Sequence, residues 1–177
     1  MTLLKNKTVF ITGASSGFGR EIAAAFAKKG SKLIIAARRA ERIKEIAALL
    51  RKKYGVEVLP ITLDVRKKTD VAKSVKALPV KWRDIDILVN NAGLSRGLDK
   101  LQEGSIQDWD EMIDTNVKGL LYVTRSVLPQ MVKRNTGHII NIGSIAGHEV
   151  YPKGNVYCAS KHAVDAITKG IRLDVVD

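Results

Sequence analysis

The sequence has a single cysteine, no long hydrophobic run and no recognisable secretion signal. Because Cys158 is the only cysteine among 177 residues, no internal disulfide can form, as is typical of proteins in a reducing compartment. No apolar stretch approaches the roughly 20 residues that a transmembrane helix needs. The first ten residues, MTLLKNKTVF, lack the basic region, apolar core and cleavage site of a signal peptide. We therefore expect a cytoplasmic protein with no membrane partner.

Aromatic residues are also scarce, although basic residues are abundant. The formal net charge is +12, and residues 1–60 hold 13 of the 30 lysines and arginines but only 4 of the 18 acidic residues. A nucleic-acid-binding surface would interleave such charge with aromatic side chains, yet these are only 5% of the chain. Most of the charges fall on the polar faces of predicted helices. We therefore favour a solvated surface that also attracts anions, and we expect no nucleic-acid partner.

Short apolar runs alternate with amphipathic segments along the chain. The runs are continuously apolar, which indicates strands buried on both faces. Helical spacing is clear between Ile43 and Leu50, and Thr69 and Ser105 are candidate N-caps of later helices. The pattern predicts strands over residues 7–13, 32–37, 56–63, 84–90 and 137–143, and helices over 17–29, 41–54, 70–78, 109–134 and from 155 onward.

This β-α-β repetition predicts an α/β fold of three layers, a doubly wound parallel sheet of the Rossmann type. Residues 1–177 form one domain in this interpretation, with strand order 3-2-1-4-5. Because the chain stops at Asp177, just after the last helix, the fifth strand would lie at an uncovered edge. We therefore expect that the later strands of the domain are missing from this segment.

A glycine-rich turn, TGASSGFG, joins the first strand to the first helix. Gly13 would permit the tight turn, Gly17 the close approach of a pyrophosphate, and Gly19 the packing of helix on strand. The free N–H groups and the positive dipole end of the helix also favour phosphate. Because a strand precedes the turn and a helix follows it, a dinucleotide site is favoured over a plain loop. The candidate cofactor-binding residues of the turn are Gly13, Ser15, Ser16, Gly17, Phe18 and Gly19.

Two arginines follow the second strand, where NAD-binding proteins of this type place an acidic residue on the ribose 2′-hydroxyl. Arg38 and Arg39 stand there in this sequence. A carboxylate would repel a 2′-phosphate, whereas a guanidinium can pair with it bidentately. Although the arginines could simply begin the next helix, their position and type favour NADP as the cofactor.

Four polar residues in the second half of the chain form a candidate catalytic group: Asn116, Ser144, Tyr157 and Lys161. Tyr157 and Lys161 are four residues apart, so on a helix their side chains share one face. A tyrosine hydroxyl is ordinarily protonated at neutral pH, and an adjacent ammonium favours the phenolate, which can act as a base. Ser144 follows the fifth strand, where its hydroxyl could bind a substrate oxygen.

These motifs, in this order and spacing, resemble the short-chain dehydrogenase/reductase family. The resemblance rests on TGASSGFG, on Asp64 after the third strand, on NNAG at residues 90–93, and on Asn116, Ser144 and the YCASK motif. It covers essentially the whole chain, and it implies that the segment following the last helix, which in the family carries further strands and the substrate lid, is missing here.

The resemblance also implies roles for the matching residues. Asn116, Ser144, Tyr157 and Lys161 would be the catalytic tetrad, in which Tyr157 is the acid/base and Ser144 orients the substrate oxygen. Lys161 would hold the nicotinamide ribose, and Asn116 would position a water in the proton relay. Asp64 and Val65 would meet the adenine and Asn90 the cofactor's ribose region. NNAG could equally brace the sheet, and in the family both roles coexist.

A narrower resemblance concerns the substrate. The stretches IDTNVKGLLYVTRSVLPQMV and GHIINIGSIAGHEVYPKGNVYCASKHAV are similar to NADP-dependent 3-hydroxy acid dehydrogenases that oxidise serine, allo-threonine and related β-hydroxy acids. A general carbonyl or 3-oxoacyl reductase with the same tetrad is the alternative enzyme. A protein that senses NADP without catalysis is an alternative of another class, although a complete tetrad argues against it.

The sequence also allows expectations about metal binding and self-association. The three histidines have no metal-ligand spacing with Cys158 or with carboxylates, so we expect no metal site. Cys158 itself is interpreted as a small packed residue. By the family resemblance, the helices over residues 109–134 and from 155 onward would pack against their copies in a homodimer or homotetramer.

Overall fold

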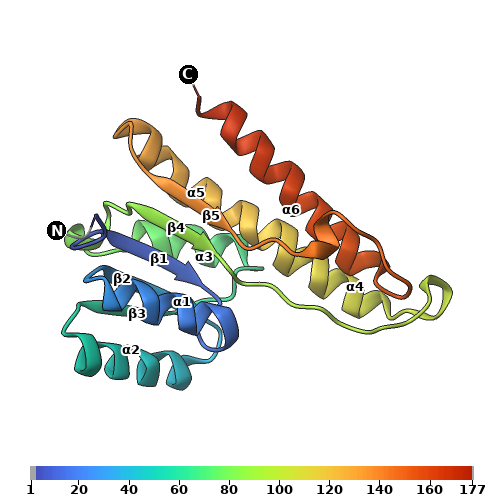
Figure 1. Ribbon diagram of the computed structural model, residues 1–177, viewed down its shortest axis with the longest axis horizontal. Helices are drawn as coiled ribbons and strands as arrows, with labels where there is room; N and C mark the ends of the chain where they lie inside the picture. Colours follow the sequence, from blue (N-terminus) through green and yellow to red (C-terminus); the bar gives the residue numbers. More distant parts are fainter. Residues whose placement is uncertain (1–2, 177) are drawn as a thin grey trace.

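Five parallel strands form one sheet in the computed structural model, which describes residues 3–176 (Figure 1). The order across the sheet is β3-β2-β1-β4-β5, and every neighbouring pair is parallel. This confirms the predicted doubly wound α/β fold and its strand order. The strands are β1 (Thr8–Thr12), β2 (Lys32–Ala37), β3 (Val58–Thr62), β4 (Ile87–Asn90) and β5 (His138–Asn141).

Helices connect the strands and cover both faces of the sheet (Figure 1). They are α1 (Gly17–Lys28), α2 (Ala40–Tyr54), α3 (Lys68–Lys76), α4 (Ile106–Ile113), α5 (Leu120–Lys133) and α6 (Asn155–Asp174). Ser105 caps α4, as predicted, because its hydroxyl accepts a hydrogen bond from the Asp108 amide. The predicted cap at Thr69 is wrong, since Thr69 lies inside α3 and Lys67 occupies the N-cap position.

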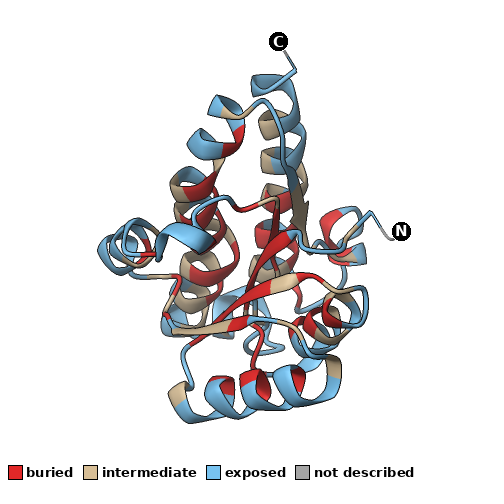
Figure 2. Cartoon of the chain, turned by 90° about the vertical axis from the view of Figure 1, so that its left-hand side faces the viewer, coloured by how far each residue is buried: buried red, intermediate tan, exposed pale blue. Residues whose placement is uncertain are grey.

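The hydrophobic core has one layer on each face of the sheet. Alternate residues of β1 point to opposite faces, so Ile11 packs with α1 and α2 while Phe10 packs with α3 and α5. Figure 2 shows the buried residues on the central strands and on the inward sides of the helices. The central strands β1 and β4 are buried at every residue, as predicted. Burial on both faces is wrong for β3 and β5, which are half-exposed because they lie at the two edges of the sheet; the edge position of β5 was itself expected.

The long helix predicted over residues 109–134 begins earlier and is not uniform. It begins at Ile106 with α4, continues through a π-helical segment, Asp114–Gly119, and then becomes α5. The π-helical segment packs against α6, and its Gly119 lies against Val65, the residue after Asp64. A Cβ at Gly119 would lie 2.7 Å from a methyl group of Val65, so the glycine permits this contact. π-helical turns are rare and are frequent at functional sites.

The carboxyl ends of β1, β2 and β4 lie side by side at one edge of the sheet. Thr12 of β1 is paired in register with Ala36 of β2, and Ile11 with Val89 of β4. Loops that leave these strand ends therefore meet, as ligand-binding loops do in open α/β sheets. Within residues 3–176, no helix is both long and apolar enough to cross a membrane.

Candidate functional site

The glycine turn between β1 and α1 has the backbone conformation that its glycines allow. Gly13 has φ +66° and Gly17 has φ +52°, in the left-handed region that favours glycine. A Cβ on Gly19 would collide with the carbonyl oxygen of Gly13, so the close approach of helix to turn requires glycine here as well. A Cβ on Gly17 would meet nothing within 4 Å, so the turn leaves open space beside the first residue of α1.

The loop after β4 holds the glycine turn in place. The Asn91 side chain donates hydrogen bonds to the carbonyl oxygens of Thr12 (3.0 Å) and Gly13 (3.2 Å). In return, the Thr12 hydroxyl accepts from the backbone amides of Asn91 and Ala92, both at 3.1 Å. Two sequence motifs, 80 residues apart, are thus joined by four hydrogen bonds. The bracing role that the sequence offered for NNAG is present in the structure.

The two arginines after β2 lie beside the same turn. Arg39 donates from Nη2 to the hydroxyls of Ser15 and Ser16, each at 2.9 Å. Arg38 reaches instead to α4, where its Nη1 lies 3.4 Å from the Glu111 carboxylate. Phe18 is 77% exposed, at the open side of the turn. Arg39 is therefore held at the glycine turn, whereas Arg38 is held toward α4.

Asp64 and Val65 follow the carboxyl end of β3, the strand next to β2. The Asp64 carboxylate accepts from Arg66 at both oxygens, with Nη2 2.6 Å from Oδ2 and Nε 3.0 Å from Oδ1. Hydrogen bonding from Arg66 lowers the pKa of Asp64 from its ordinary value and raises that of Arg66. Val65 is buried, and it lies against Gly119 of the π-helical segment. Asp64 is therefore ionised and held in one orientation.

The side-chain amide of Asn90 forms hydrogen bonds with other residues of the protein. Its Nδ2 donates to the Thr124 hydroxyl of α5 and to Oδ1 of Asn141 in β5, each at 2.9 Å. Asn141 in turn donates to the Thr168 hydroxyl of α6 at 2.9 Å. This polar chain links α5 to α6 through the sheet. The buried Oδ1 of Asn90 has no protein partner among the described residues, and the predicted cofactor contact of Asn90 stays a prediction.

Asn116 lies in the π-helical segment and joins two other parts of the chain. Its Oδ1 accepts from the Leu94 amide at 2.9 Å, while its Nδ2 donates to the Leu94 carbonyl at 2.8 Å and to the Ser160 hydroxyl at 3.0 Å. The side chain is buried, with 2% of Asn116 exposed. Ser160 donates onward to the Tyr157 carbonyl at 2.7 Å. Asn116 thus links the loop after β4 to the helix that carries Tyr157 and Lys161.

Tyr157 and Lys161 lie one turn apart on α6, as their spacing predicts. The Lys161 ammonium is 5.9 Å from the centroid of the Tyr157 ring and donates to the Ile142 carbonyl at 2.9 Å. Lys161 is 8% exposed, and its burial lowers the pKa of its ammonium from the ordinary value. A Cβ at Gly93 would lie 3.2 Å from Asn116 Oδ1 and 3.7 Å from Lys161 Nζ. Asn116 and Lys161 therefore converge on Gly93.

Ser144 begins a short 3₁₀ helix, η4 (Ile145–Gly147), that packs against α6. The Ser144 oxygen accepts a hydrogen bond from the Ala146 amide at 3.2 Å. Gly147 lies against the backbone of Lys161, since a Cβ there would be 2.8 Å from the Lys161 carbonyl oxygen. The segment after β5 is thus fixed against α6 twice, through Gly147 and through the ammonium bond of Lys161 to Ile142.

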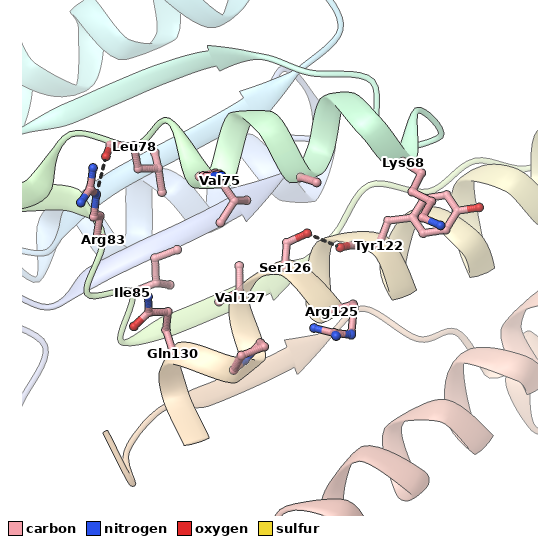
Figure 3. A pocket seen from close by; sticks show the side chains of 13 residues that line it. Lys68, Val75, Leu78, Arg83, Ile85, Tyr122, Arg125, Ser126, Val127 and Gln130 are labelled. Carbon is pink, nitrogen blue, oxygen red and sulfur yellow. Dashed lines mark hydrogen bonds between the residues drawn. The ribbon is translucent and has the colours of Figure 1, made fainter. Parts of the chain in front are cut away.

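Two of the depressions in the surface are lined by different parts of the described chain. One is lined by Tyr157 together with Met112, Trp109 and the loop of residues 95–105. Another lies between α3 and α5, with Lys68 and Tyr122 on its walls (Figure 3). None of the residues predicted for cofactor or substrate lines the second depression. Among residues 3–176, no group of three His, Cys, Asp or Glu side chains is arranged to hold a metal ion.

Sequence reasoning missed several residues that organise this site. Glu111 contacts Arg38 and Arg66 from 73 and 45 residues away, and no local pattern marks such a contact. Ser160 stands inside the YCASK motif and could have been noticed there. Leu94 offers only backbone groups to Asn116, so its side chain carries no signal.

The chain is similar to known proteins along nearly its whole length. The family model described as short chain dehydrogenase matches residues 7–177. An NADP-dependent 3-hydroxy acid dehydrogenase of Salmonella typhi is 49% identical over 167 residues, which are 94% of this chain and 66% of the relative. One from Schizosaccharomyces pombe is 46% identical over 178 residues, 100% of this chain and 69% of the relative.

A solved structure is also closely similar. The closed form of a serine dehydrogenase complexed with NADP+ superposes with a TM-score of 0.90 at 46% identity, covering 96% of this chain and 66% of the other. The chain therefore spans about two thirds of the length of the proteins that it resembles.

Proposed function

Because the chain belongs to the short-chain dehydrogenase family, we propose that it is an oxidoreductase that transfers a hydride between NADP and the alcohol carbon of a small β-hydroxy acid. Serine, allo-threonine and related 3-hydroxy acids are the proposed substrates, in line with the names of its relatives. The observation that carries the proposal is the pairing of Tyr157 with the buried Lys161 ammonium, 5.9 Å from its ring centroid.

The residues around the glycine turn fit NADP. Positive φ at Gly13 and Gly17 and the open space beside Gly17 suit a pyrophosphate at the start of α1. Arg38 and Arg39 offer guanidinium donors where NAD-specific proteins offer a carboxylate. When bound, the cofactor supplies the nicotinamide carbon that takes or gives the hydride. Asp64, Val65 and Asn90 are proposed to border its adenosine part.

Tyr157 is the proposed acid/base. In alcohol oxidation its phenolate takes the proton of the substrate hydroxyl, and in the reverse direction its hydroxyl returns that proton. The Lys161 ammonium, 5.9 Å from the centroid of the Tyr157 ring, is proposed to hold the nicotinamide ribose. Because Ser144 Oγ accepts from the Ala146 amide, its own hydroxyl proton remains available to a substrate oxygen. Asn116 is proposed to position the loop after β4 against α6 and a water in the proton relay.

Replacement of Tyr157 by phenylalanine tests this assignment in the full-length protein. General acid/base catalysis typically contributes about 10²–10⁴-fold, so kcat should fall at least that far in Tyr157→Phe. NADP affinity should change little, whereas Lys161→Ala should weaken both affinity and rate. Tyr122→Phe, the same chemical change at a tyrosine of the α3–α5 depression, is the control and should retain parental kinetics. Rates are followed by the absorbance of the reduced cofactor.

Two outcomes would redirect the proposal. Near-parental turnover in Tyr157→Phe would reject the catalytic assignment and favour an NADP-sensing protein. A clear preference for simple ketones or 3-oxoacyl substrates over β-hydroxy acids would favour a general reductase with the same residues. Association into a homodimer or homotetramer, a cytoplasmic location, and the extent of the domain beyond residue 177 stay predictions.

A further inference from the structure

The Glu111 carboxylate lies among three guanidinium groups at the edge of the candidate nucleotide site. Its Oε2 accepts from Arg96 Nε at 2.8 Å, and its Oε1 lies 3.1 Å from Arg66 Nη1 and 3.4 Å from Arg38 Nη1. The side chain is only 20% exposed. Hydrogen bonding from Arg96, followed by the charges around it, lowers the pKa of Glu111. The carboxylate is therefore ionised at neutral pH.

Two of these arginines fix the carboxylate. Arg66 is itself held by Asp64, which accepts from its Nε and Nη2, so its Nη1 is presented to Glu111 in a defined direction. Arg96 approaches the other oxygen from the loop after β4. Glu111 thus has little freedom to turn, since both of its oxygens are engaged by partners from different parts of the fold.

The third arginine, Arg38, is in a different situation. Its only hydrogen bond within residues 3–176 is the one from Nη1 to Glu111, and half of its side chain is exposed. A guanidinium has five N–H donors, so most of those of Arg38 remain available. Arg39 beside it is oriented in a similar way, by the hydroxyls of Ser15 and Ser16.

The fold brings Arg38 next to the phosphate-binding turn. The end of β2 pairs with the end of β1, and the Ala14 amide donates to the Ala36 carbonyl at 3.1 Å. Arg38 therefore leaves the sheet alongside the glycine turn. Its flexible side chain would otherwise sample many rotamers, and ordering such a side chain on binding weakens affinity.

We propose that Glu111 is a positioning residue for cofactor selection: it holds the Arg38 guanidinium where its free donors meet the 2′-phosphate of NADP. The proposal rests on the NADP-dependent function proposed above. NAD carries a hydroxyl at the same position and would gain little from an oriented guanidinium. Selection of NADP over NAD therefore depends on Glu111, although Glu111 touches neither cofactor.

The negative charge of Glu111 has the opposite effect on NADP affinity, because a carboxylate repels the 2′-phosphate. Three guanidinium groups surround it, however, and solvent and salt screen its longer-range field. The loss of orientation at Arg38 should therefore outweigh the loss of repulsion when the carboxylate is removed. The two effects differ in sign, which makes them separable by experiment.

Binding of NADP and of NAD to the full-length protein is measured by calorimetry for four single variants and one double variant. Glu111→Gln should bind NADP about three- to ten-fold more weakly and NAD within about two-fold of the parent. Glu111→Asp keeps the charge but retracts it by one methylene from Arg38, so positioning predicts a similar loss. Asp110→Asn, the same charge change at the exposed neighbouring residue, should leave both affinities nearly unchanged.

The fourth variant, Arg38→Ala, separates this proposal from the proposed function. It should itself weaken NADP binding, and Glu111→Gln should have no further effect in its background. If Arg38→Ala leaves NADP binding unchanged, the proposed role of Arg38 fails together with this inference. If Arg38→Ala weakens NADP but both Glu111 variants bind it as the parent does, or more tightly, only the positioning role is overturned.

Discussion

Asn116 allows a stability prediction whose magnitude can be worked out from its contacts. Its side chain makes three hydrogen bonds, two with the Leu94 backbone and one with the Ser160 hydroxyl, between 2.8 and 3.0 Å. Each contributes about 1 kcal/mol net, and a buried group left without a partner adds to the loss. Alanine regains roughly 0.5 kcal/mol through its higher helix propensity. Asn116→Ala should therefore lower the free energy of unfolding by about 2–3 kcal/mol.

Urea unfolding followed by circular dichroism measures this loss. A protein with the usual stability of roughly 5–15 kcal/mol would remain folded, so the change is measurable at equilibrium. Gln130→Ala, which removes an exposed amide from α5 of the same continuous helix, should change stability by less than about 0.5 kcal/mol. Asn116→Asp keeps the acceptor for the Leu94 amide but turns an oxygen toward the Leu94 carbonyl, so it should destabilise at least as much as alanine.

A loss below about 0.5 kcal/mol in Asn116→Ala would refute the reasoning, because it would mean that water replaces these bonds at no cost. A loss in Asn116→Ala matched by Gln130→Ala would equally contradict it, since the effect would then belong to the helix and not to the contacts of Asn116.

Two further predictions concern the glycine turn and the acidic limit of stability. Gly19→Ala should destabilise the protein by about 1–3 kcal/mol, because the new Cβ would meet the Gly13 carbonyl oxygen. Gly170 lies in open space inside α6, so Gly170→Ala should stabilise the protein by roughly 0.5–1 kcal/mol. Thermal unfolding checks the sign of both changes. The pKa of Asp64 is lowered in the fold by its bond to Arg66, so its stabilisation is complete above its ordinary value of 3.8 and is lost as pH falls through the lowered value. Asp64→Asn should therefore show a shallower loss of stability below about pH 4 than the parent, and equal slopes would contradict the argument.

The sheet could be predicted from sequence because its signals are local. Continuous apolar runs such as KLIIAA identify buried strands, and the β-α-β repetition together with the glycine turn fixes a parallel order. The spacing of Tyr157 and Lys161 is local too, so their shared helix face was predictable. The half-exposure of β3 was not, because an apolar run has the same composition whether or not a neighbouring element covers it, whereas the uncovered edge at the fifth strand was expected.

Contacts between elements that are distant in the chain could not be predicted from the sequence. Glu111 follows the pattern of an ordinary acidic residue on a helix surface, and only the packing of α4 near the ends of β2 and β3 brings it to Arg38 and Arg66. The reach of Arg39 to Ser15 and Ser16 depends likewise on the geometry of the turn. The length and charge of a side chain determine what kind of group it can bind. The fold determines which partner lies within its reach.

The π-helical segment Asp114–Gly119 shifts the phase of the helix that contains it. A π turn uses more residues than an α turn, so residues of α4 and α5 that are counted at regular helical intervals do not share a face. Leu120 is buried and Leu121 is 41% exposed on the α5 side of this shift. If all six residues of this segment adopted regular α-helical geometry instead, everything on one side of the segment would rotate by about 100° relative to the other side. The faces that α4 and α5 present therefore depend on this segment remaining π-helical, whereas a substitution at exposed Lys118 should leave them unchanged.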